Sequence, residues 1–109
     1  MRTNKKLEVK AYLNVNFELC IEEFKCSPEE IYTYFLLPSF NWARDRNDAL
    51  VIQFGSMKPS LDYLQTNFGR LAFEFGIEAC EKHLNFFADY EGPREMVKDE
   101  VWSRMKLKS

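Results

Sequence analysis

An alternation of apolar and polar residues near the N-terminus constrains the fold of this chain more than any other feature. Every odd-numbered position from 7 to 21 is apolar, and most of the residues between them are polar or charged. A period of two is typical of a β-strand with one face in a core and the other in water. A slip of one residue would expose the whole apolar set. The pattern therefore predicts a long N-terminal strand over residues 7–21.

A helix is expected to follow this strand. Ser27 suits the N-cap, Pro28 suits the first helical position, and Glu30 stands where the partner of a capping box belongs. Pro38 has no N–H to donate, so we expect the helix to end there.

Residues 39–55 have the pattern of a β-hairpin. Apolar residues alternate on both arms, and a three-residue loop at Asp45-Arg46-Asn47 would set Trp42 opposite Leu50. The second arm has the clearer pattern, and irregular structure is the alternative for the first.

Beyond Pro59 the apolar residues recur every three or four positions, in two stripes offset by two residues. On one straight helix these stripes would lie about 200° apart. The segment is then either a helix buried on all sides or two helices that meet at Gly69 or Gly76. We favour two helices, over residues 59–68 and 70–90, because a glycine inside a helix costs about 1 kcal/mol. A short strand at Arg70–Phe75 is the alternative reading, and Gly92 and Pro93 then begin a last helix.

These elements give the order β-α-β-β-α-α-α. We expect a single α+β domain over residues 1–109, in which helices pack on a small antiparallel sheet built from the long strand and the hairpin. Basic residues gather at 1–6 and 107–109, which we expect to be flexible ends. A strand over residues 7–21 would be about 50 Å long and would outreach the hairpin. It would then bend, fold back near Asn14, or pair with a second copy to form a homodimer.

Composition places the chain among ordinary globular proteins, with 46% apolar and 29% charged residues. No apolar run approaches the roughly 20 residues that a membrane span needs, and the basic N-terminus has no apolar segment typical of a secretory signal. Three cysteines without framework spacing favour reduced thiols. We therefore expect a cytoplasmic protein.

The charges are unevenly distributed. Residues 7–100 hold all 17 acidic residues and nine of the 15 basic ones, which gives this body a net charge of −8. The remaining cations lie at the two ends. Such a body would repel nucleic acid and attract a basic partner, although charged residues of this kind also serve simply to solvate a surface.

No pattern of residues names a reaction. Cys80 and His83 would share one face of a helix and, with Cys20 and Cys26, could complete a zinc site. The spacing of Cys20 and Cys26 is wrong for a zinc knuckle, and Cys80 belongs to an apolar stripe, so buried thiols are the favoured reading. Whether the four residues meet stays open. We expect that the protein binds no metal and no cofactor and that it is not an enzyme.

Protein binding is the function that the sequence favours, by an inhibitor, immunity-type or adaptor protein that occludes a basic partner surface or mimics nucleic acid. The candidate residues are those on the solvent face of the first strand and at the hairpin tip: Tyr12, Asn14, Asn16, Glu18, Trp42, Arg44, Asp45 and Arg46. The alternative is nucleic-acid binding through the Arg44-Asp45-Arg46 tip and the basic termini. The partner, the pathway and the oligomeric state do not follow from the sequence.

Residues 17–37 resemble one known fold family. A strand that leads to the capped helix at Ser27, Pro28 and Glu29 is similar to the opening of helix-grip (START-like) domains. The rest of the chain lacks the long antiparallel meander of those domains, so the resemblance implies no ligand cavity or activity here.

Overall fold

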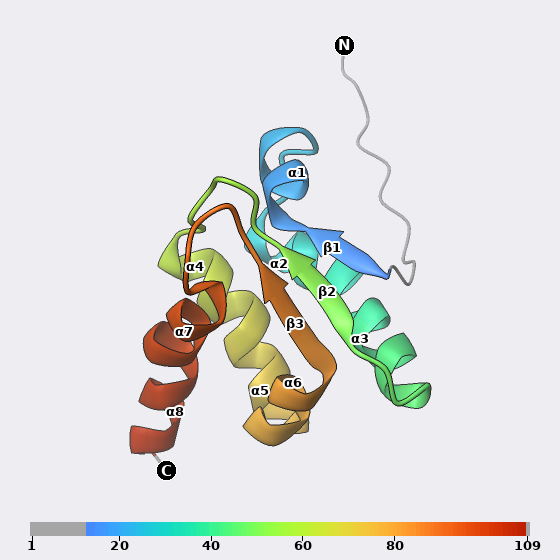
Figure 1. Cartoon of the computed structure of the whole chain (residues 1–109), viewed down its shortest axis with the longest axis vertical. Coiled ribbons are helices and arrows are strands. Elements are labelled where there is room, and N and C mark those ends of the chain that lie inside the picture. Colours follow the sequence, from blue (N-terminus) through green and yellow to red (C-terminus); the bar gives the residue numbers. More distant parts are fainter. Residues whose placement is uncertain (1–12, 109) are drawn as a thin grey trace.

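A three-stranded parallel sheet lies at the centre of the molecule (Figure 1). The computed structural model describes the backbone of residues 13–108 and the side chains of residues 13–105. The strands are β1 at Asn14–Asn16, β2 at Leu50–Gln53 and β3 at Leu84–Phe87, in the order β1-β2-β3. Both pairings are parallel, with Val15 beside Ile52 and Ile52 beside Phe86. The chain is therefore α+β, but the expected antiparallel sheet is wrong.

Helices connect and follow the strands. They are α1 at Phe17–Glu22, α2 at Pro28–Ile31, α3 at Leu37–Asp45, α4 at Leu61–Leu64, α5 at Arg70–Phe75, α6 at Ile77–His83, α7 at Pro93–Val97 and α8 at Ser103–Lys108. Three π-helical turns, η1 at Tyr32–Leu36, η2 at Gln65–Gly69 and η3 at Lys98–Trp102, join α2 to α3, α4 to α5 and α7 to α8. The result is three long helices, over residues 28–45, 61–75 and 93–108, which we call the first, central and last helices.

The long helices lie together on one face of the sheet. Leu50 and Ile52 of β2 are buried on that face, whereas Val51 and Gln53 are only half-buried on the other. In Figure 1 the sheet lies in front of α2, α4 and α5, and no described helix crosses in front of β2. Both faces of a parallel sheet are usually covered. Here asparagine and glutamine replace the usual aliphatic residues on the open face, at Asn14, Asn16, Gln53 and Asn85.

The core between the sheet and the helices is aromatic. Phe17 stacks on Phe68 at 5.4 Å, and Phe68 meets Phe86 edge to face at 5.2 Å. Trp102 is 1% exposed, and its indole N–H donates to the carbonyl of Phe68 at 3.1 Å. Trp102 also meets Phe86 of β3 at 6.1 Å, so these contacts fasten the last helix to the central helix and to the sheet.

The predicted strand over residues 7–21 is wrong from Phe17 onward. Asn16 ends β1 and also caps α1, because its side chain accepts a hydrogen bond from the Leu19 N–H at 2.9 Å. Phe17 and Cys20, three residues apart, are the buried pair of this helix. The apolar residues of this segment fit the period of a strand as well as that of a helix. The cap formed by Asn16 favours the helix. Residues 7–12 lie outside the described part of the chain.

The predicted hairpin is wrong in its first arm, which is α3, and correct in the position of its second, which is β2. Pro38 does not end the helix that begins at Pro28. The turn before it is π-helical, and the Leu37 N–H donates five residues back to Tyr32. Such a turn gives a proline ring room inside a continuing helix. Phe40 and Ala43 then pack inward at helical spacing.

The predicted boundary at Gly69 is wrong, and Gly76 is the joint. Gly69 lies inside the central helix, whereas Gly76 has φ +93° and separates α5 from α6. Residues 84–87 form β3 rather than the end of a helix, although the apolar spacing of three and four continues through them. The alternative strand at Arg70–Phe75 is also wrong.

Two predicted helix starts are confirmed. The Ser27 hydroxyl accepts from the Glu30 N–H at 3.2 Å and the Glu30 carboxylate accepts from the Ser27 N–H at 2.8 Å, which is a complete capping box. Pro93 begins the last helix after Gly92. The resemblance to helix-grip domains fails, because a helix replaces its strand at Phe17–Glu22. Of the expected flexible ends, residues 1–6 lie outside the described part, and α8 continues to Lys108.

Candidate functional site

The predicted site residues separate into two groups at opposite ends of the sheet. Asn16 and Glu18 lie where β1 ends and α1 begins, whereas Trp42 and Arg44 lie near the end of α3, just before β2 begins. Figure 1 shows α1 and the end of α3 far apart, at the two ends of the parallel strands. Asn14 is exposed on the open face of the sheet, and Tyr12 lies outside the described residues. One surface therefore cannot use all of them.

The arginines at the end of α3 are held by their own chain. The guanidinium of Arg46 lies 4.1 Å above the Trp42 ring, and it donates to the Trp42 carbonyl at 3.3 Å. The guanidinium of Arg44 lies 4.6 Å above the Phe75 ring. Asp45 is exposed between them. The expected hairpin tip is thus a helix end whose cations cover aromatic rings.

At the other end of the sheet, Glu18 fastens α1 to the loop after β2. Its carboxylate accepts from the Ser56 hydroxyl at 2.8 Å and packs directly against Gly55. Gly55 has φ +65°, and any side chain there would collide with Glu18. No pattern in the sequence points to Ser56, because the contact joins residues 38 positions apart.

A shallow acidic hollow of about 360 Å³ lies along α1. Its lining includes Glu18, Leu19, Glu22 and Glu23. Leu19, which lines the hollow, is 43% exposed. Phe24, which follows Glu23 in the chain, is 45% exposed. The hollow therefore combines three carboxylates with one apolar side chain, Leu19, in contact with water.

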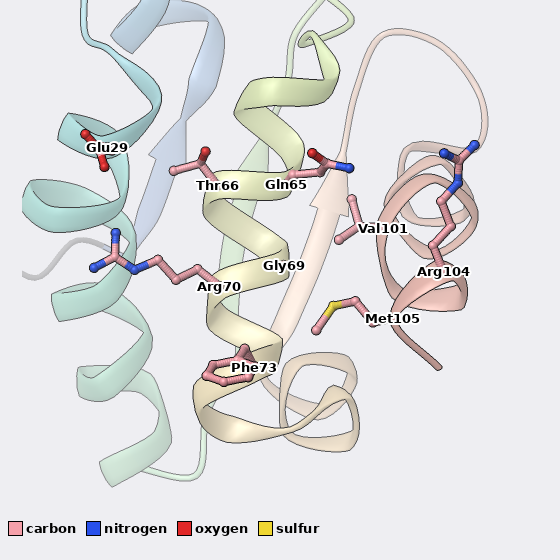
Figure 2. Close-up of a pocket in the computed structure, with 9 residues that line it drawn as sticks. All are labelled: Glu29, Gln65, Thr66, Gly69, Arg70, Phe73, Val101, Arg104 and Met105. Atoms are coloured by element: carbon pink, nitrogen blue, oxygen red, sulfur yellow. The ribbon is translucent and has the colours of Figure 1, made fainter. Parts of the chain in front are cut away.

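A larger groove of about 580 Å³ lies on the outer side of the helical layer, away from the sheet (Figure 2). Gly69 and Thr66 of the central helix form its middle, Glu29 lies on the first helix, and Val101 and Arg104 lie on the last helix. A Cβ on Gly69 would lie 3.3 Å from Val101, so this glycine allows the central and last helices to approach closely. This close approach explains why a glycine stands inside the helix although it destabilises the helix.

Phe73 projects from the central helix at the end of this groove (Figure 2). Its side chain is 83% exposed, more than any other large apolar residue described. Phe73 belongs to one of the two apolar stripes of the sequence, but it is exposed, because the helix turns this side of α5 away from the sheet. Aromatic residues are enriched at the centre of protein interfaces relative to the rest of the surface.

The polar wall of the groove is fixed by a chain of contacts. The Arg70 guanidinium lies 4.4 Å above the Tyr32 ring, and the Tyr32 hydroxyl donates to the Glu74 carboxylate at 3.2 Å. Burial, together with Glu74, raises the pKa of Tyr32 to about 12. Tyr32 is therefore a neutral hydrogen-bond donor at neutral pH and holds Arg70 at the edge of the groove.

The cysteines and the histidine do not form a metal centre. Among residues 13–108, no three His, Cys, Asp or Glu side chains gather as metal ligands. His83 is bound instead to the Asp48 carbonyl at 2.7 Å. Burial raises the pKa of the Cys20 and Cys80 thiols to about 12, so neither is a thiolate nucleophile at neutral pH.

Comparisons with protein-family models, with curated proteins and with solved structures found no match for this chain. Within residues 13–108, the helices are too short or too polar to cross a membrane. The function is therefore argued from the surfaces alone.

Proposed function

We propose that this chain is a protein-binding module that occludes a basic surface of its partner. The acidic hollow on α1 carries this proposal. Glu18, Glu22 and Glu23 line it together with the exposed side chain of Leu19. Carboxylates steer a basic partner toward the surface, and apolar side chains supply affinity once water is excluded.

The position of the hollow in the fold also supports this proposal. It lies at the carboxyl end of β1, and the bond from Ser56 to Glu18 fixes α1 in place. A surface that is fixed before binding loses little conformational entropy in the complex. An inhibitor, an immunity-type protein or an adaptor would each use such a surface.

Nucleic-acid binding is the alternative, and it has less support. Arg44 and Arg46 both lie over aromatic rings of their own chain, and the carboxylate of Asp45 stands between them. Both arginines are exposed, but residues 7–100 carry a net charge of −8, which repels a polyanion.

Affinity capture with charge-reversed variants tests the proposal. Wild-type protein is compared with Glu22→Lys/Glu23→Lys in a lysate of the source cells, with and without nuclease. We expect a captured protein that survives nuclease, that dissociates as salt rises, and that the double variant loses. Glu91→Lys/Glu95→Lys makes the same change of charge at two exposed positions near α7 and should retain the partner.

Two results would contradict the proposal. One is a partner that the Glu22→Lys/Glu23→Lys variant still binds at full strength. The other is a captured complex that disappears with nuclease and with Arg44→Ala/Arg46→Ala, which would establish the nucleic-acid alternative.

A further inference from the structure

We infer that the groove of the helical layer binds a second copy of this chain, in a two-fold symmetric dimer. The inference goes beyond the proposed function and uses a different surface. This surface differs from the first strand, through which the sequence predicts a homodimer.

The first argument is shape. An isologous dimer needs one surface that is complementary to itself. On the outer face of the helical layer, Phe73 projects at the end of the groove of about 580 Å³ (Figure 2). The middle of the groove is low because its central residue is Gly69. Two copies of this face can therefore approach closely along the groove, with their Phe73 side chains in contact at one end of it.

The second argument is charge. Figure 2 shows Glu29 and Arg104 on opposite sides of the central helix, at about the same level along it. A two-fold axis that runs along the central helix places Glu29 of one protomer opposite Arg104 of the partner subunit, and the reverse pair forms by symmetry. The same axis brings the two Phe73 rings together. Arg104 is free to exchange partners, because its bond to Glu100 is 3.8 Å long and both side chains are well exposed.

The third argument is area. The central helix has 15 residues, four in α4, five in η2 and six in α5. It is therefore about 22 Å long, and three helices at 8–10 Å spacing present a face on the order of 600 Å² per protomer. A standard interface buries about 800 Å² per protomer. The dimer should therefore be weak, with a dissociation constant in the micromolar range.

Sedimentation velocity over about 5–500 µM protein tests the inference, since this range brackets a micromolar dissociation constant. We expect the wild-type chain to shift from monomer to dimer across the range. Phe73→Ala should weaken the dimer at least about tenfold, as loss of a central aromatic contact does. Phe87→Ala is the matched control, because Phe87 is 50% exposed on the open face of the sheet and should leave the dimer unchanged.

A charge swap tests the symmetry. Glu29→Arg and Arg104→Glu should each weaken the dimer, because each sets like charges opposite one another. The double variant Glu29→Arg/Arg104→Glu restores opposite charges and should recover dimerisation. Thermal unfolding of every variant checks that the fold is intact, and the double variant keeps the test valid if one single variant folds poorly.

Three results would overturn the inference. If the wild-type chain stays monomeric at the highest concentration, the groove does not bind a second copy, and any partner that it has is a different protein. A dimer unchanged by Phe73→Ala would use another surface. A charge-swapped variant as weak as the single variants would exclude the two-fold pairing of Glu29 with Arg104. None of these results bears on the acidic hollow, so this inference and the proposed function can fail separately.

Discussion

At the scale of single residues, Gly76 is the joint on which the arrangement of α5 and α6 depends. Its φ of +93° with ψ of 149° is a conformation that side chains other than hydrogen rarely allow. No atom lies within 4 Å of the position that a Cβ would take, so a substitution there acts through the backbone alone. Gly76→Ala should therefore lower the free energy of unfolding by about 1–3 kcal/mol in urea titrations. Glu78→Ala, on the exposed side of α6, should change it by less than about 0.5 kcal/mol. Equal free energies of unfolding for the two variants would show that a side chain at position 76 does not strain the backbone.

At the scale of elements, the π-helical turn η1 explains how Pro38 is tolerated inside the first helix. In a regular helix a proline costs about 3 kcal/mol, through a lost hydrogen bond and a clash with the preceding turn. Because η1 already widens that turn, Pro38→Ala should change the free energy of unfolding by less than about 1 kcal/mol. Asn41→Pro, at an exposed position three residues further along α3, lacks such a turn and should cost about 3 kcal/mol or more. A large gain of stability from Pro38→Ala would mean that the proline strains the helix after all.

Among the elements, the patterns of the sequence predict some correctly and others not. The capping box at Ser27 and the start of the last helix at Pro93 depend on residues a few positions apart, and both are confirmed. The second arm of the predicted hairpin is β2. The π-helical turn before Pro38 leaves no mark in the sequence, so the sequence predicts a helix end at Pro38 and a strand in the next segment, where the structure has α3. Leu84 and Phe87 satisfied a helical period in the sequence and lie on a strand in the fold.

At the scale of the whole molecule, buried thiols link stability to pH. Burial raises the pKa of Cys20 and Cys80 from 9.0 to about 12 in the folded chain, so the folded state holds these protons more tightly than the unfolded state. The stabilising effect is complete below pH 9 and is lost as pH rises from 9 toward 12. The free energy of unfolding should fall over this window by up to about 1.4 kcal/mol per pH unit for each thiol.

Urea titrations from neutral pH to about pH 11, under a reducing agent, measure this slope. Cys20→Ala/Cys80→Ala should lower stability at every pH, because it leaves cavities, but should flatten the fall above pH 9. A double variant with the same slope as the wild-type chain would show that other groups govern alkaline unfolding.

Local chemistry in the sequence was enough to place the helix starts at Ser27 and Pro93, because helix caps depend on residues a few positions apart. The strand direction, the groove and the exposure of Phe73 depended on contacts between residues far apart. Phe73 has the same apolar side chain whether a helix turns it toward the sheet or away from it, and only the packing of three helices on one face settles which. The acidic residues of α1 were visible in the sequence as charge, but their meeting with Leu19 in one hollow required Asn16 to cap a helix where the alternating pattern indicated a strand.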